Sequence, residues 1–176
     1  MARQRSIRDA VAGSGIGVHS GKRVDIRLLP APADSGITFR RTDLDPPAEI
    51  SARAHLVRDT QLCTALVDDS GVRVATIEHL MSALAGVGID NIIIELNAPE
   101  VPIMDGSAAP FVYLLQQAGI REQDAAKRFI QILEPVEVRE GDKCARLSPF
   151  AGCRFDFAIE FDYSCVHATM ALAHRY

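Results

Sequence analysis

Two segments of this sequence have apolar residues at helical spacing, whereas in the other apolar stretches polar and apolar residues alternate as they do in β-strands. Both segments, residues 76–85 and 107–118, place apolar side chains three and four residues apart, so each helix has one apolar face. The residues of these two faces are Ile77, Leu80, Met81, Leu84, Phe111, Leu114, Leu115 and Ala118. A chain that combines two such helices with several strands is restricted to a mixed, α+β fold.

The ends of both segments carry residues that begin or stop helices. Thr76 and Ser107 are each expected to act as an N-cap, because a short hydroxyl side chain accepts a hydrogen bond from a free N–H group of the first turn. Glycine follows both segments, as Gly86 or Gly88 and as Gly119, and is expected to end them.

Strand patterns dominate the first seventy residues and return after residue 125. Residues 23–29 alternate between polar and apolar side chains and follow the glycine-rich segment 13–21, a combination that predicts a hairpin. The other predicted strands are 37–41, 60–67, 91–96, 128–133, 136–139, 145–147 and 154–161. A polar stretch separates the second helix from the later strands, and we place a domain boundary near residues 120–127.

Composition excludes several classes of protein. Of the 176 residues, 48% are hydrophobic, which suffices for a packed core, and the net charge of −4 with scattered Lys and Arg argues against nucleic acid as a partner. No apolar run is long enough for an integral membrane segment, and no signal-peptide pattern begins the chain. The four cysteines have no paired spacing, so we expect a cytoplasmic protein with reduced thiols.

Glu78 and His79 lie side by side on the first predicted helix and are the most informative polar pair in the chain. Imidazole is a common metal ligand and a carboxylate can take a proton from water, so the pair is typical of metal-assisted hydrolysis. Taken alone, the pair also fits a partly exposed helix surface on which a neighbouring carbonyl group satisfies the histidine. A catalytic zinc usually has three protein ligands, and this helix supplies one.

Three other polar residues have both a functional and a structural interpretation. His19 fits a loop that contacts a ligand, or the end of a strand between glycines that form a bulge. Cys63 lies near the place where a site beside Glu78 would open, although a single cysteine more often packs in a core. Asp105 is most simply explained as a turn or helix-cap carboxylate.

Five motifs occur in the order found in one enzyme family, at residues 12–21, 39–44, 76–80, 88–91 and 100–108. With them, residues 3–162 closely resemble UDP-3-O-acyl-N-acetylglucosamine deacetylase, the zinc hydrolase of the committed step of lipid A biosynthesis in Gram-negative bacteria. The resemblance implies a duplicated α+β fold of two-layer sheet and helix domains, with the active site at their junction. It also implies that the N-acetyl group is removed from a UDP-linked acylated glucosamine.

The resemblance assigns roles to individual residues. His79 matches the Zn²⁺ ligand of the first domain, and Glu78 matches the base that activates zinc-bound water against the acetamide carbonyl. Positions that border the substrate pocket are matched by His19, Leu62 and Cys63. The region that contacts the UDP portion is matched by Lys143, Glu160 and Phe161.

The resemblance by motifs stops after residue 162. We therefore expect a first domain at residues 1–124, the initial strands of a second domain at residues 125–162, and an unmatched tail at residues 163–176. The family's other two zinc ligands and its catalytic acid belong to the second domain, so this chain by itself is expected to show little or no turnover. His167 and His174 lie well before the family's ligand positions and are not expected to replace them.

Two further expectations concern partners. Strands of an incomplete second domain lack their helical cover, so aggregation or self-association is predicted through exposed Phe155, Phe157, Ile159 and Phe161. The alternative to an enzyme is a non-catalytic fragment that binds a UDP-sugar or has a regulatory role. An RNA-binding α+β domain is disfavoured by the acidic charge balance.

Overall fold

A computed structural model describes residues 2–158 and 174–175, and the chain divides into two compact units. The first unit is Met1–Arg128 and the second is Phe129–Tyr176. Four residues singled out from the sequence lie outside the described residues, namely Ile159, Glu160, Phe161 and His167.

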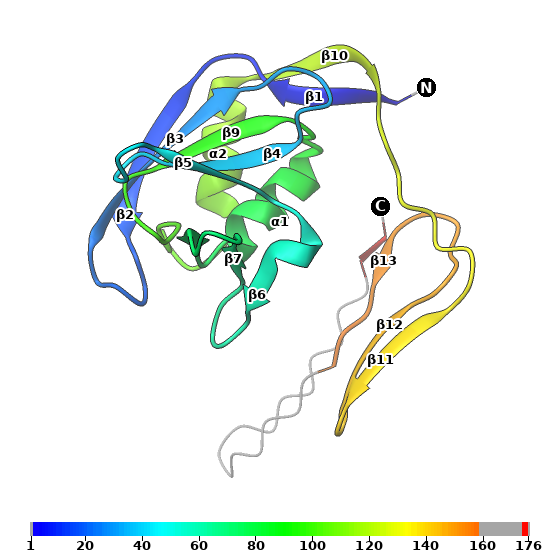
Figure 1. The fold of residues 1–176 in the computed structure, drawn as a ribbon. Helices are drawn as coiled ribbons and strands as arrows, with labels where there is room; N and C mark the ends of the chain where they lie inside the picture. The colour runs from blue at the N-terminus through cyan, green and yellow to red at the C-terminus, as the bar shows by residue number, and fades with distance from the viewer. Residues whose placement is uncertain (1, 159–173, 176) are drawn as a thin grey trace. The chain divides into compact units, whose positions relative to one another are not determined.

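The first unit mixes strands with two α-helices and one 3-10 helix (Figure 1). In chain order its elements are β1 (Arg3–Ile7), β2 (Val11–Ile16), β3 (Arg23–Pro30), β4 (Ile37–Arg41), β5 (Ala48–Ser51), η1 (Ala54–Leu56), β6 (Val57–Asp59), β7 (Ala65–Val67), β8 (Arg73–Val74), α1 (Glu78–Val87), β9 (Ile92–Leu96), α2 (Ala109–Ala118) and β10 (Ile120–Ala126). This mixture confirms the mixed fold class predicted from the sequence. Among the described residues, no helix is long and apolar enough to cross a membrane.

Five strands form the central sheet in the order β2-β3-β9-β4-β5. The predicted hairpin is confirmed, because β2 and β3 pair antiparallel with Gly13 opposite Ile26. Strand β9 pairs antiparallel with β3 and parallel with β4. Along β3, residues alternate between exposed and buried up to Leu28, as expected for a sheet with one covered face.

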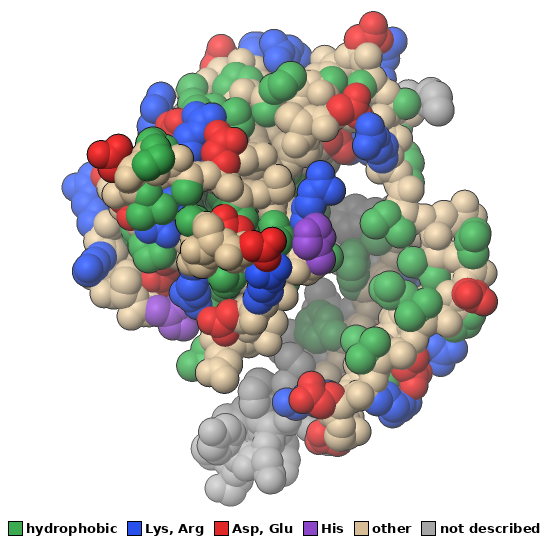
Figure 2. All heavy atoms as spheres, in the orientation of Figure 1, with side chains coloured by type: hydrophobic (Ala, Val, Ile, Leu, Met, Phe, Trp, Pro, Cys, Tyr) green, Lys and Arg blue, Asp and Glu red, His purple; other side chains and the backbone are tan. Residues whose placement is uncertain are grey.

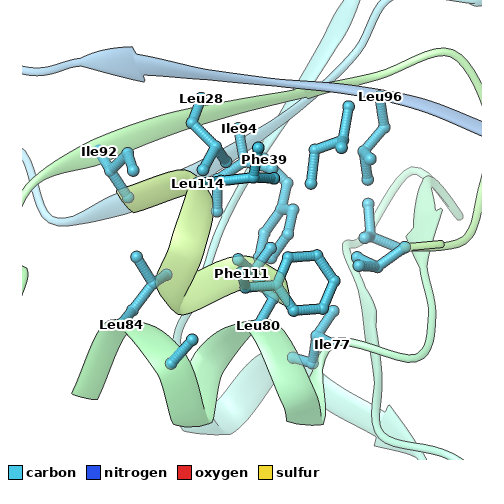
Figure 3. Close-up of a cluster of buried hydrophobic side chains, with 14 of the residues drawn as sticks. Leu28, Phe39, Ile77, Leu80, Leu84, Ile92, Ile94, Leu96, Phe111 and Leu114 are labelled. Atoms are coloured by element: carbon cyan, nitrogen blue, oxygen red, sulfur yellow. The ribbon is translucent and has the colours of Figure 1, made fainter. Parts of the chain in front are cut away.

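Helices α1 and α2 provide that cover. Figure 3 shows sheet residues Leu28 and Ile94 directed toward helix residues Leu80 and Phe111, and all four side chains are fully buried. Burying a side chain of this size contributes about 1.5–3 kcal/mol. The apolar faces predicted from helical periodicity are therefore confirmed as the core of this unit, with Met81 packed against it while only partly buried.

The start of α1 differs from the prediction. The helix begins at Glu78 with Ile77 at the cap position and no side-chain cap bond. Thr76 has a φ of 57°, and its hydroxyl donates to the buried carboxylate of Glu100. The prediction that Thr76 caps the helix was wrong, because a carboxylate distant in sequence takes its hydroxyl. Gly88 ends the helix as expected, with a φ of 80°.

The start of α2 lies closer to the prediction. Ala108 occupies the cap position without a side-chain cap bond. Ser107, one residue earlier, still accepts a hydrogen bond at its Oγ from the N–H of Ala109 at 3.2 Å. Pro110 lies in the first turn, where its missing N–H removes no helical hydrogen bond.

The polar segment after α2 forms a strand rather than a linker. Strand β10 pairs antiparallel with β1, so that Ile7 lies opposite Ile120 and Arg3 opposite Ala126. Gln123 of this strand is buried and accepts a hydrogen bond from Asn91 at 2.7 Å. The first compact unit therefore extends to Arg128.

Strands β6, β7 and β8 form a three-stranded antiparallel sheet, and they directly precede α1 in the chain. The strand predicted at 60–67 is shorter than expected, because only residues 65–67 pair, as β7. Residues 60–64 form a loop, and the N–H of Thr64 in this loop donates a hydrogen bond to Glu78 in the first turn of α1.

The second unit contains two antiparallel strand pairs among its described residues. Strands β11 (Val136–Glu140) and β12 (Lys143–Leu147) pair antiparallel, as do the short β13 (Arg154–Phe155) and β14 (His174–Arg175). The predicted strands at 136–139 and 145–147 are confirmed, whereas residues 128–133 form no strand. Figure 2 shows apolar side chains gathered on the visible surface of this unit.

Candidate functional site

Glu78 lies in the first turn of α1 and is held by the loop before β7. Its Oε2 accepts a hydrogen bond from the N–H of Thr64 at 3.1 Å. The N–H of Ile77 donates in turn to the carbonyl oxygen of Thr64 at 3.3 Å. These reciprocal bonds fix the Glu78 carboxylate at the positive end of the helix, where a negative charge is stabilised.

His79 has a ring nitrogen that the protein leaves without a partner. Its Nδ1 is buried and has no hydrogen-bond partner within the described part of the chain. Buried polar atoms are nearly always paired, so an unpaired one calls for an explanation such as a bound ion or water. The structural interpretation, in which a neighbouring carbonyl satisfies the histidine, is therefore not seen at Nδ1.

Asp105 forms a turn close to His79. Its Oδ1 accepts hydrogen bonds from the hydroxyl and the N–H of Ser107, at 2.8 and 2.9 Å. These bonds lower the pKa of Asp105, and the charge of His79 adds a smaller lowering effect. The interpretation of Asp105 as a turn carboxylate is confirmed, and its charge lies near enough to act on the imidazole.

His19 projects from the loop that joins β2 and β3 and is exposed. Its charge contributes to lowering the pKa of Asp59, after the larger effects of hydrogen bonds from the Gln61 N–H and the Arg73 guanidinium. The loop of His19 therefore lies close to Asp59 at the end of β6, which precedes the 60–64 loop that holds Glu78. Two segments distant in the sequence meet beside the first turn of α1.

Leu62 and Cys63 lie in this second loop but differ in exposure. The side chain of Leu62 is 93% exposed, and its φ of 60° is uncommon for a residue other than glycine. Cys63 is buried with Ala65 and Ala75, and its Sγ lies 3.9 Å from a guanidinium nitrogen of Arg73. The packing interpretation of Cys63 is what the structure shows, whereas the side chain of Leu62 is exposed to solvent.

The remaining predicted contacts belong to the second unit. Lys143 is the first residue of β12 and is exposed. Glu160 and Phe161 lie outside the described residues.

Glu100 begins the motif at residues 100–108, but sequence reasoning gave it no role, and its side chain is only 3% exposed. Its carboxylate accepts hydrogen bonds from the N–H groups of His19 and Ser20 and from the hydroxyl of Thr76. Burial raises the pKa of Glu100, but the bonds from His19, Ser20 and Thr76 outweigh it and hold the pKa below its ordinary value. The signal available in the sequence was a carboxylate placed between apolar residues and two prolines.

The described residues supply one side chain that suits a zinc ion. An imidazole with an unpaired buried nitrogen fits a metal ligand, and a carboxylate beside it fits a group that accepts a proton from water. Within residues 2–158 and 174–175, no three His, Cys, Asp or Glu side chains lie together as a metal site. A complete zinc site therefore needs ligands beyond those described.

A fixed carboxylate beside an unpaired imidazole fits the class of metal-dependent hydrolases, in which a metal activates water and a base takes its proton. The model of the UDP-3-O-acyl N-acetylglycosamine deacetylase (LpxC) family matches residues 4–174, and the chain belongs to this family. The match extends twelve residues past residue 162, where the resemblance by motifs ends. The family is that of a hydrolase.

Individual relatives agree with the family match. The chain is 57% identical over 169 residues to the UDP-3-O-acyl-N-acetylglucosamine deacetylase of Idiomarina loihiensis, which covers 96% of this chain and 55% of the relative. It is 59% identical over 166 residues to the enzyme of the same name from Vibrio vulnificus, covering 94% and 54%. The chain thus spans about half the length of the curated relatives it matches.

Proposed function

We propose that Glu78 and His79 are the base and one zinc ligand of an enzyme that removes the N-acetyl group from UDP-3-O-acyl-N-acetylglucosamine. The observation that carries the proposal is the buried, unpaired Nδ1 of His79 beside a carboxylate fixed by the Thr64 N–H. Membership of the deacetylase family supports the same reaction. In this reading the whole enzyme has the length of its relatives, and this chain contributes the first half of its site.

Each residue has a defined task in the proposed reaction. A bound zinc ion would polarise the acetamide carbonyl and make water a better nucleophile. Glu78 takes the proton from that water, and the bond from Thr64 keeps its carboxylate from turning away. His79 would hold the metal through its imidazole, and the charge of Asp105 nearby would favour a positive centre.

The substrate contacts are part of the same proposal. His19 and the exposed Leu62 lie on the two loops beside Glu78, where they would border the sugar, with Cys63 packed beneath. The exposed side chain of Lys143 would suit the diphosphate, and the resemblance implies UDP contacts for Glu160 and Phe161 as well. We also propose a cytoplasmic location, in which the thiols of Cys63, Cys144 and Cys153 would stay reduced.

The proposed domains are residues 1–124 as a first deacetylase domain, 125–162 as the initial strands of a second, and 163–176 as a tail. Two helices layered on one face of a sheet in the first unit support the first of these assignments. The exposed apolar side chains of the second unit support strands that lack a cover among the described residues. Self-association through those strands follows from the same exposure.

A turnover assay on the 176-residue chain tests the proposal. With added zinc, we expect little or no deacetylation of UDP-3-O-acyl-N-acetylglucosamine, because one ligand does not hold zinc in a catalytic geometry. Activity comparable with that of the Vibrio vulnificus relative would contradict the one-ligand account. Calorimetry with UDP and metal analysis of the same sample separate the half-site from a non-catalytic binding protein. A non-catalytic binding protein would bind UDP without needing zinc.

A further inference from the structure

Glu100 carries a buried charge, and its hydrogen-bond partners within the described part of the chain are neutral. Its side chain is 3% exposed, and the described groups that donate to it are backbone N–H groups and hydroxyls, among them the His19 N–H, the Ser20 N–H and the Thr76 hydroxyl. A buried carboxylate is costly unless hydrogen bonds replace the lost water, so these donors must stay in place for the charge to be tolerated. The contacts of Glu100 therefore constrain the segments that supply them.

The donors come from two separate parts of the chain. Oε1 accepts from the His19 N–H at 2.9 Å and from the Thr76 hydroxyl at 3.1 Å. Oε2 accepts from the Ser20 N–H at 3.1 Å. One carboxylate oxygen thus joins the β2–β3 loop to the residue two positions before α1.

The backbone around Glu100 supports this junction. The Ala75 N–H donates to the carbonyl oxygen of Pro99 at 2.9 Å, and the Val101 N–H donates to that of Ala75 at 3.0 Å. Glu100 is therefore held alongside the segment that enters α1. On the loop side, a Cβ on Gly17 would overlap Oε2 of Glu100 and Oγ of Ser20, so the loop backbone packs directly against the carboxylate.

Thr76 itself has an uncommon backbone conformation. Its φ of 57° lies in the left-handed region, which β-branched residues rarely adopt. The residue is buried, and its hydroxyl bond to Glu100 offsets the unfavourable conformation. The turn that precedes Glu78 and His79 is thus stabilised by Glu100, a residue outside the helix.

We propose that Glu100 is a positioning residue, which ties the loop of His19 to the start of α1 and so sets the placement of His19 relative to Glu78 and His79. That these three residues act on a substrate rests on the proposed function. The tie between the two segments rests on the hydrogen bonds alone.

Amide hydrogen exchange of the 176-residue chain, measured by NMR without zinc or substrate, tests the tie. The Glu100→Gln variant keeps the shape of the side chain but replaces one accepting oxygen by an NH₂ donor. We expect the amides of His19 and Ser20 to exchange at least about tenfold faster. The amides of Thr64 and Ile77, which report the placement of Glu78, are expected to exchange faster as well. Amides of the β3–β9 pairing are expected to keep their rates.

A pair of Thr76 variants tests the helix end of the tie separately. Thr76→Val removes the hydroxyl and keeps the branched shape, and it is expected to speed exchange at Thr64 and Ile77. Thr76→Ser keeps the hydroxyl, so the amides of Thr64 and Ile77 are expected to exchange at wild-type rates in this variant. This pair also decides the proposal if Glu100→Gln does not fold.

Three results would overturn the proposal. The first is unchanged exchange of the His19 and Ser20 amides in Glu100→Gln, and the second is equal acceleration of all amides, including those of the β3–β9 pairing. The third is exchange of the Thr64 and Ile77 amides that is as fast in Thr76→Ser as in Thr76→Val. The second would reduce Glu100 to a contributor to general stability. Because these rates need neither zinc nor turnover, their outcome is independent of whether the deacetylase proposal holds.

Discussion

The two compact units use strands of similar pattern with opposite results. In the first unit, β3 alternates between exposed and buried residues, and its buried residues meet α1 and α2. In the second unit, β11 also alternates between apolar and charged residues, yet every one of its residues is exposed. No helix lies among the described residues of the second unit. Alternation thus predicts a strand, whereas burial depends on what covers it.

The largest expected difference between the units is in core stability. Phe111→Ala removes a fully buried ring and is expected to lower the free energy of unfolding by about 3–5 kcal/mol. Phe155→Ala, in the second unit, removes a ring that is 61% exposed. This variant is expected to change the free energy of unfolding by less than about 0.5 kcal/mol. Urea unfolding followed by circular dichroism measures both. Equal losses in the two variants would remove the contrast.

Self-association tests the exposed surface of the second unit. Val138 lies on β11 and is 67% exposed, so Val138→Glu places a charge on the apolar surface. We expect it to weaken association by about tenfold, equivalent to about 1.4 kcal/mol, in sedimentation experiments over a range of concentrations. Ile16→Glu, at a residue of the first unit with similar exposure, is the control and is expected to leave association unchanged. A monomeric wild-type chain at high concentration would contradict the prediction.

Acid titration tests the buried charge of the first unit. Because the folded-state pKa of Glu100 is lowered from its ordinary 4.5, its contribution to stability is fully present above pH 4.5 and is lost as the pH falls through the lowered value. The difference in unfolding free energy between wild type and Glu100→Gln is therefore expected to be largest near neutral pH and to shrink on acidification. A difference that stays constant down to pH 3 would show that the charge of Glu100 contributes nothing.

The smallest expected effect is a gain in stability. Gly86 lies in α1, and a Cβ at this position meets no atom within 4 Å. Gly86→Ala is expected to stabilise the first unit by about 0.5–1 kcal/mol, because alanine restricts the unfolded chain more than glycine does. Gly141→Ala, in the β11–β12 turn at a φ of 61°, is the matched change in the second unit. It is expected to strain that turn without altering the unfolding of the first unit. Thermal denaturation resolves the two.

Local patterns in the sequence were sufficient for the helices and the central hairpin. The helix stripe of Leu80 and Leu84 and the alternation of residues 23–29 depend on near neighbours, so periodicity found them. Pairing of β1 with β10 was missed, because its register depends on residues more than a hundred positions apart. The wrong cap at Thr76 has the same origin, since its partner Glu100 follows much later in the chain.

The candidate site shows the same division. The resemblance predicted the family, which is confirmed, and it is the source of the proposed roles of Glu78, His79, His19, Leu62 and Cys63. The motifs did not reveal that Thr64 holds Glu78 through a backbone N–H, because any residue type can donate such a bond. Nor did they indicate a role for Glu100, which depends on the fold bringing two loops together. The sequence allowed proposals that rest on a side chain's identity, whereas it did not predict hydrogen bonds that depend on how the fold places the backbone.

A hybrid enzyme tests the central claim most directly. In it, the first unit of this chain replaces the matching residues of the Vibrio vulnificus relative, and kcat for deacetylation is compared between the hybrid and its Glu78→Gln variant. The account predicts an active hybrid whose kcat falls by about 10²–10⁴-fold in the variant, because the carboxylate no longer accepts the proton from water. A variant that keeps the kcat of the active hybrid would contradict the assignment of Glu78 as the base.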